Sequence, residues 1–292
     1  MKYRLTILAL GSIALLSLPS CSTPPTPTQG STDSTATAQR DAQTDVIKIG
    51  GSSSAISLLK TLADEYQPMA KNTKIEMLDP GQSETVIAGV KQKIMDVGSI
   101  SKTLKPEEND GTLEIREVAH DGLLVATHSS VTGIKNLTAA DLKAIYSGSI
   151  TNWKDLGGPD ATIVVLDRPE DESAKRLLRK HYLGDDLKNS PTTVILRKEG
   201  ELIQAIQNTP NSIGAFSLAH AISHNLSVNR MSLDGIEPTA ANIKAGTYLM
   251  RRSIVLVWHK NPSAATQQLT QYIFSAPGSA VLEKSGFVTL RS

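Results

Sequence analysis

Three short segments rich in glycine and serine could each bind a negatively charged oxygen group. Residues 50–55 read Gly-Gly-Ser-Ser-Ser-Ala between a predicted strand and a predicted helix, and residues 79–84 and 98–102 carry glycine and serine at comparable junctions. Free backbone N–H groups at a helix start, with hydroxyls beside them, make an anion site. The same residue types are ordinary helix caps. Three such junctions together favour anion binding, because α/β sheets bind ligands at the carboxyl ends of their strands.

The sequence offers little support for an enzyme. It contains no Gly-x-Ser-x-Gly nucleophile elbow and no His-Glu-x-x-His pair. Its histidines are scattered, and only His220 and His224 share a predicted helical face. A surface or capping role is favoured for this pair because no acidic or cysteine ligand accompanies it. We therefore predict a protein that is not an enzyme and that has no cofactor and no metal site.

The first 20 residues follow the plan of a secretory signal peptide. Lys2 and Arg4 precede an apolar run at 5–18 that contains no acid, and this run is shorter than the roughly 20 apolar residues of a membrane span. Leu-Pro-Ser at 18–20 then precedes Cys21, which resembles the bacterial lipobox. We expect lipidation at Cys21, with an incidental cysteine as the alternative. Because Cys21 is the only cysteine, an internal disulfide and a thiolate zinc site are excluded.

Residues 21–45 are predicted to be a disordered tether. They are mostly Ser, Thr, Pro, Gln, Ala and Gly, with no large apolar side chain after the cysteine until position 46, so they cannot bury enough surface to order themselves. A glycosylated or partner-binding stalk is the alternative. Without residues 1–20 the net charge is about −1, which suggests neither nucleic acid nor an anionic membrane surface as a partner.

Strand and helix patterns alternate over the rest of the chain, residues 46–292. Predicted strands lie at 46–49, 74–78, 114–119, 122–127, 163–166, 193–196 and 253–259. Predicted helices lie at 55–66, 84–95, 139–146, 173–182, 201–209, 263–274 and 278–285. This alternation is typical of an α/β fold. The length allows one large domain or two smaller lobes.

One stretch carries a specific family resemblance. Residues 137–158 read Leu-Thr-Ala-Ala-Asp-Leu-Lys-Ala-Ile-Tyr-Ser-Gly-Ser-Ile-Thr-Asn-Trp-Lys-Asp-Leu-Gly-Gly, which closely resembles a signature of the substrate-binding subunit of ABC-type phosphate importers. Further matching stretches are 49–54, 96–108, 120–125, 212–216, 248–257 and 286–290. The resemblance covers essentially residues 46–290, so it concerns the whole globular part.

The resemblance implies the two-lobed type II periplasmic-binding-protein fold, an α/β fold with two crossover hinge strands. Lobe one is expected at 46–121 plus 228–292, and lobe two at 122–227. In this class the ligand lies in the cleft between the lobes, which close around it.

The resemblance also implies which residues contact the ligand. Positions that contact phosphate in the family correspond to Ser54, the backbone of Ala55, Ser83, Ser101 and Arg168. Arginine suits this role because its guanidinium can donate two parallel hydrogen bonds to a phosphate.

The segment after the arginine departs from the family pattern. The family has Gly-Ser-Gly-Thr there, whereas this chain has Pro-Glu-Asp-Glu-Ser at 169–173. Pro169 lacks an N–H donor, and three carboxylates would repel a dianion. Either Ser173 supplies the missing hydroxyl while the acids point outward, or the site takes a different ligand. Acids in a first helical turn also complement the helix dipole.

These acids suggest a further hypothesis about selectivity. Monohydrogen phosphate carries a proton that sulfate lacks, so a carboxylate in the cleft could accept from phosphate and repel sulfate. Ser101 stands at the family's usual acceptor position, which leaves that role open. We expect Asp171 or Glu172 to turn into the cleft and take it.

The sequence therefore predicts an extracytoplasmic lipoprotein of the cell envelope that captures inorganic phosphate, or a related oxyanion, for the permease subunits of an ABC importer. It is expected to be a monomer that meets the membrane only through its lipid. The alternative is a non-transport sensory or binding lipoprotein of the same fold with an altered or lost ligand.

Overall fold

The computed structural model describes residues 44–102, 104 and 108–290. The predicted signal peptide, Cys21 and almost all of the predicted tether lie outside the described residues. Residues from Ala42 onward form one compact unit. Within the described part of the chain, no helix is long and apolar enough to cross a membrane.

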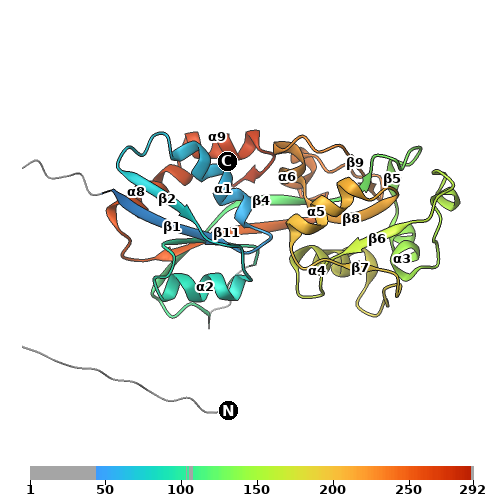
Figure 1. The fold of residues 1–292 in the computed structure, drawn as a ribbon, viewed down its shortest axis with the longest axis horizontal. Coiled ribbons are helices and arrows are strands. Elements are labelled where there is room, and N and C mark those ends of the chain that lie inside the picture. Colours follow the sequence, from blue (N-terminus) through green and yellow to red (C-terminus); the bar gives the residue numbers. More distant parts are fainter. Residues whose placement is uncertain (1–43, 103, 105–107, 291–292) are drawn as a thin grey trace, which may run out of the picture. The chain divides into compact units, whose positions relative to one another are not determined.

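A mixed sheet of ten strands runs through the described residues (Figure 1). Its main path has the order β2, β1, β3, β11, β4, β8, β6, β7, while β9 and β12 pair with β4 beside this path, and β5 and β10 form a separate pair. The strands are β1 (Asp45–Gly51), β2 (Thr73–Met77), β3 (Val97–Ile100), β4 (Leu113–His128), β5 (Asn136–Leu137), β6 (Val164–Asp167), β7 (Val194–Ile195), β8 (Ser212–Ser217), β9 (Val228–Arg230), β10 (Ser232–Leu233), β11 (Arg251–His259) and β12 (Val288–Thr289).

Helices pack around this sheet. They are α1 (Ile56–Tyr66), α2 (Ser83–Lys91), α3 (Ala139–Ser147), the 3₁₀ turn η2 (Trp153–Leu156), α4 (Ser173–Leu178), the π-helical turn η3 (Arg179–Leu183), α5 (Glu199–Asn208), α6 (Leu218–Ser223), α7 (Ala240–Ala245), α8 (Ala264–Ile273) and α9 (Ala276–Lys284). Helix α3 begins as its sequence predicts, because Thr138 and Asp141 form a reciprocal capping box.

Helix α2 is shorter than the pattern predicts. It ends at Lys91 instead of 95 because the chain turns sharply there. Lys93 adopts a left-handed conformation with φ 57°. The N–H groups of Ile94 and Met95 then both donate to the Gly89 carbonyl, which stops the helix.

Strand β4 crosses the molecule and joins two separately packed regions. Residues 113–122 of β4 pair with β11, and residues 123–127 pair with β8. The sequence predicts two strands here, 114–119 and 122–127, separated at His120 and Asp121, and this prediction is wrong: β4 is continuous from Leu113 to His128. Gly122 permits close packing at the crossing, because a Cβ there would lie 2.4 Å from Ile243 Cδ1.

The two regions have different apolar cores. Helices α1, α8 and α9 cover one face of β1, β3 and β11, with Ile47, Leu59 and Leu256 fully buried between them, and α2 covers the opposite face. Around β8 and β6, a second core contains Trp153, Phe216 and other side chains from 123–221.

The lobe boundaries expected from the sequence stay a prediction. One packing feature bears on them: Met231, Leu233, Ile243, Tyr248 and Met250 pack into the same core as residues 123–221. The segment 231–250 therefore packs with the second region, although the resemblance placed it in lobe one.

Candidate anion-binding cleft

The three glycine and serine segments lie side by side. The Ser52 N–H donates to the Ser99 carbonyl at 2.8 Å, and the Ser53 N–H donates to the Gly81 carbonyl at 3.0 Å. Ser52 and Gly81 also form an isolated parallel bridge. Gly51 allows this close approach, because a Cβ there would lie 2.3 Å from Ser99 Oγ. The carboxyl ends of β1 and β3 thus form one polar edge of the sheet.

From the other lobe, Arg168 and Glu172 reach this edge. Glu172 forms an ion pair with Arg168 Nη2 at 2.9 Å, and the two side chains are only 5% and 2% exposed. The Glu172 carboxylate also accepts from Ser54 Oγ at 3.3 Å and from Gln82 Nε2 at 3.0 Å. Arg168 Nη2 donates to Ser53 Oγ at 3.2 Å. We call Ser53, Ser54, Gln82, Arg168 and Glu172 the cleft cluster.

Arg168 has donor capacity left over. Its Nη1 is buried, and among the described residues it has no hydrogen-bond partner. Leaving a buried donor unpaired costs about 1–3 kcal/mol, more when the group is charged. An anion that accepts a hydrogen bond from Arg168 Nη1 would remove this free-energy cost.

A second buried pair fixes the turn that carries Arg168. Asp167, at the end of β6, accepts from the Arg168 N–H at 2.8 Å and from Asn189 Nδ2 at 2.8 Å. Lys175 of α4 donates to the same carboxylate, and both side chains are almost completely buried. Strand β6 and helix α4 are therefore locked together on either side of the acidic segment.

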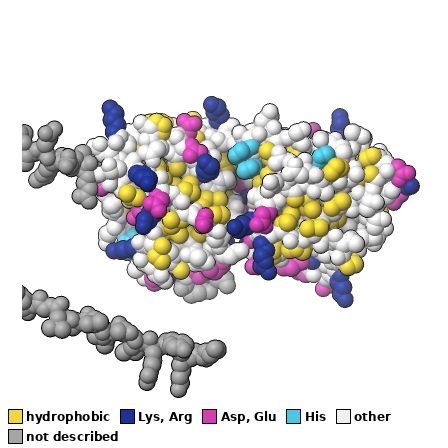
Figure 2. All heavy atoms as spheres, in the orientation of Figure 1, with side chains coloured by type: hydrophobic (Ala, Val, Ile, Leu, Met, Phe, Trp, Pro, Cys, Tyr) yellow, Lys and Arg dark blue, Asp and Glu magenta, His cyan; other side chains and the backbone are white. Residues whose placement is uncertain are grey.

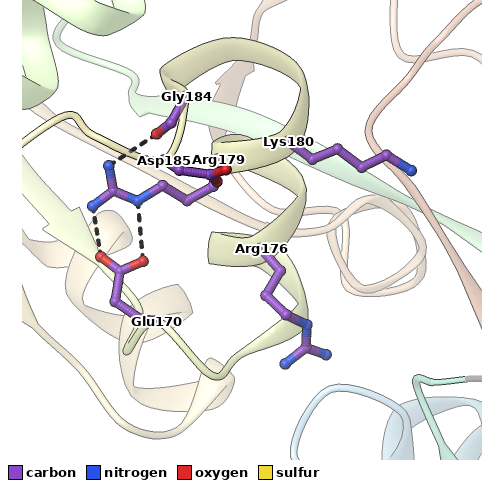
Figure 3. Close-up of a pocket in the computed structure, with 6 residues that line it drawn as sticks. All are labelled: Glu170, Arg176, Arg179, Lys180, Gly184 and Asp185. Atoms are coloured by element: carbon purple, nitrogen blue, oxygen red, sulfur yellow. Dashed lines mark hydrogen bonds and ion pairs between the residues drawn. The ribbon is translucent and has the colours of Figure 1, made fainter.

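The three acids of this segment have three different surroundings. Glu170 is 62% exposed and pairs with Arg179 Nη2 at 2.7 Å (Figure 3). The hydrogen bond from Arg179 lowers the pKa of Glu170. Asp171 is exposed, and only its backbone carbonyl contacts a neighbouring side chain, that of Arg176. Glu172 alone among the three is buried, against Arg168, Ser54 and Gln82.

A different arginine cluster lies where the crossing strands meet. Arg252 of β11 stands opposite Asp121 of β4 and contacts its carboxylate at 2.8 Å. It also contacts Glu199 at 2.9 Å and donates to Ser173 Oγ at 3.1 Å. Asp121 further accepts from Ser217 Oγ at 3.0 Å. We call these five residues the hinge cluster.

Burial and pairing act in opposite directions within the hinge cluster. Burial raises the pKa of Asp121 above its usual value. Burial would lower the pKa of Arg252, but the carboxylates of Glu199 and Asp121 outweigh it and raise that pKa. Arg252 therefore stays charged and holds two acids at the crossing.

Four residues predicted as ligand contacts have other surroundings. The Ala55 N–H donates to the Ser52 carbonyl at 2.9 Å, within the turn. Ser83 is buried as the first residue of α2, and it is the preceding residue, Gln82, that contacts Glu172. Ser101 and Ser173 both line a cavity of about 360 Å³. The predicted set is thus divided between the cleft cluster, its supporting turns and this cavity.

Sequence reasoning missed Gln82 and the hinge cluster apart from Ser173. One signal could have found the hinge: Asp121 and Arg252 are charged residues just before the apolar runs 123–126 and 254–257 of their strands. A charge in such a place requires a buried partner of opposite sign. No comparable signal marks Gln82, whose contact spans 90 residues of sequence.

On the face shown in Figure 2, charged side chains of both signs gather where the two lobes meet, between broader apolar patches.

Comparison with known proteins places this chain in a family. Residues 26–277 match the family described as the PBP superfamily domain. The phosphate-binding protein PstS of Borreliella burgdorferi is 27% identical over 255 residues, which cover 85% of this chain and 91% of that protein. PstS of Bacillus subtilis is 27% identical over 207 residues, covering 69% of this chain and 66% of that protein.

Solved structures agree on the fold. A substrate-binding protein from Clostridium perfringens, solved with bound phosphate, matches with a TM-score of 0.73 and 26% identity, covering 85% of this chain and all of that one. An ABC-type phosphate transport receptor from Vibrio cholerae matches in fold with a TM-score of 0.60 and 23% identity, covering 84% of this chain and all of that one. These relatives are binding proteins, not enzymes. The chain belongs to the PBP superfamily and has the type II periplasmic-binding-protein fold that its sequence predicts.

Proposed function

We propose that this protein captures inorganic phosphate, or a related oxyanion, in the cleft between its lobes and delivers it to an ABC permease. The observation that carries the proposal is the buried Arg168 Nη1, a charged donor without a partner among the described residues. It lies in a cluster to which the opposite lobe contributes Ser53, Ser54 and Gln82. The names of the relatives agree with this ligand.

Glu172 is proposed as the group that selects phosphate. Its carboxylate accepts two hydrogen bonds and forms one ion pair with Arg168, whereas a carboxylate offers about four acceptor sites. The remaining site can accept the proton of monohydrogen phosphate, and fully ionised sulfate has no proton to offer. Asp171 is the poorer candidate because its side chain is exposed and contacts no member of the cleft cluster.

Calorimetric titration of the purified protein with phosphate and sulfate tests the proposal. We expect saturable binding of phosphate and much weaker binding of sulfate. Absence of phosphate binding at millimolar concentration would reject it. The second candidate, a sensory or binding protein with another ligand, would then be favoured. The reason is that the Glu172 carboxylate already binds Arg168 and Ser54, two donors that a phosphate would otherwise use.

The proposal extends to attachment and location. We propose that the chain is exported, lipidated at Cys21 and held at the extracytoplasmic face of a membrane as a monomer, with its permease as partner. Cys21→Ala should release the protein from the membrane fraction or block its maturation. Normal processing with unchanged membrane association would refute anchoring at Cys21.

A further inference from the structure

A basic cavity lies at Ser173, the residue that follows Glu172 in the chain. It has a volume of about 360 Å³ and is lined by Ser101, Lys102, Ser173, Arg176, Leu177, Lys180, Arg251, Arg252 and Ser253. Among the described residues, this lining contains basic residues, hydroxyls and one leucine, but no acid. The volume lies within the range of pockets that hold small organic ligands. A single inorganic phosphate would leave much of it unfilled.

One wall of the cavity is a continuous face of α4 and η3. Ser173, Arg176, Leu177 and Lys180 follow one another at helical spacings of three, one and three residues, which places them on the same side of the helix. From Ser173 to Lys180 this face extends about 10 Å. Figure 3 shows Arg176 and Lys180 pointing away from the Glu170–Arg179 pair. This basic face therefore begins at the hinge cluster and leads outward.

Three of the cations on this lining have no carboxylate partner among the described residues. Arg252 and Lys102 do have such partners: Arg252 pairs with Asp121 and Glu199, and Lys102 pairs with Glu84 and Glu108.

The other three cations make at most contacts to backbone. Arg176 donates to the carbonyl of Asp171, and Arg251 donates to the carbonyl of Ile243. Lys180 has no ion pair within the described part of the chain, and its charge lowers the pKa of His181 after the larger effect of burial. Arg176, Lys180 and Arg251 thus bring positive charge to the cavity that no acid of the described residues neutralises.

We propose that this cavity is a second anion subsite, which takes the distal phosphoryl group of a condensed phosphate such as diphosphate. The inference rests on the proposed function, because the proximal phosphoryl group would occupy the cleft beside Arg168. Ser173 lines the cavity and directly follows Glu172 of the cleft cluster in the chain. Its hydroxyl accepts from Arg252 Nη1, which leaves its own proton free to donate to an anion. The guanidinium of Arg176 can bind the distal group through two parallel hydrogen bonds.

The test compares phosphate with diphosphate as calorimetric ligands for the purified protein, without divalent cations. We expect diphosphate to bind the wild type at least about tenfold more tightly than phosphate, a difference of about 1.4 kcal/mol that one additional charge-assisted hydrogen bond can supply. The double variant Arg176→Gln/Lys180→Gln should lose most of this advantage while its affinity for phosphate changes little. Lys74→Gln, on the exposed edge strand β2, is the matched control for loss of charge.

Each result decides between the alternatives. Equal affinities for the two ligands in the wild type would overturn the second subsite and leave the proposed function intact. An equal loss of both ligands in the double variant would also overturn it, because that is the result of general electrostatic attraction. Diphosphate binding without phosphate binding would support the subsite and reject phosphate as the ligand.

Discussion

Two buried arginines, Arg168 and Arg252, differ in how completely their donors are used. Each side chain is 2% exposed, and each is paired with a carboxylate. Arg252 makes five hydrogen bonds, to Asp121, Glu199 and Ser173, and a guanidinium has five N–H donors. Arg168 bonds through Nη2, whereas its Nη1 has no partner among the described residues.

The difference shows that burial and ion pairing do not by themselves identify a binding arginine. Both side chains meet those criteria, yet only Arg168 has a donor for a ligand. Arg252 is saturated by groups from β4, α4 and α5, so its role is to hold the crossing of the lobes together. Counting donors therefore supports the proposed ligand-binding role of Arg168 and a structural role for Arg252.

The largest expected effect is on folding. Arg252→Ala would leave Asp121 and Glu199 buried without their cation, and breaking a buried ion pair in this way costs about 3–5 kcal/mol. The free energy of unfolding, measured by urea denaturation, should fall by about this amount. Arg168→Ala should cost less, because Glu172 keeps its bonds from Ser54 and Gln82. Equal losses of stability in both variants would contradict the assignment.

For phosphate affinity, unlike stability, the largest loss is expected for a change at Arg168. Arg168→Ala is expected to weaken phosphate binding by about 2–5 kcal/mol, the cost of removing one partner from a buried hydrogen-bonded charge pair. Ser54→Ala removes only a neutral hydroxyl and should cost about 1–3 kcal/mol. Calorimetry of the two variants measures both values. The assignment fails if Ser54→Ala costs as much as Arg168→Ala, or if neither changes the affinity.

The acids after Arg168 sharpen the comparison further. Glu172→Gln replaces one acceptor by a donor, so phosphate should bind more weakly, by about 1–3 kcal/mol, and sulfate should bind more strongly. Asp171→Asn removes the same charge one residue away, from an exposed side chain, and is the matched control. Tighter phosphate binding by Glu172→Gln would show that this carboxylate competes with the ligand instead of selecting it.

The sequence predicts the loops of the cleft better than their contacts. The three glycine and serine junctions and the start of helix α3 are visible because local patterns determine them, whereas Arg168 comes from the family resemblance. The direction of Glu172 is not visible, because its partners Gln82 and Ser54 lie 90 and 118 residues away. The pattern predicts a break between strands at 120–121, but Asp121 is buried in an ion pair with Arg252, a tertiary contact that outweighs local propensity.

The smallest expected effect concerns the outer edge of the hinge cluster. The backbone N–H of His220 donates to Ser217 Oγ, and its ring stacks on His224 at 3.9 Å between centroids. Burial, then the charge of His224, lowers the pKa of His220 below its usual 6.5. The folded protein therefore binds fewer protons than the unfolded chain, so its stability should fall as the pH drops through about 6.5 towards the lowered value.

Thermal unfolding at pH 7.5 and pH 5.5 measures this loss. His220→Gln should lose less stability over that interval than the wild type, although His120 and His181, whose pKa values burial also lowers, keep part of the dependence. The same comparison at pH 8, where histidine is uncharged in both states, gives the pH-independent cost of the substitution. An identical pH dependence in the variant would contradict a lowered pKa of His220 in the folded protein, because only a pKa that differs between the folded and unfolded states makes stability depend on pH.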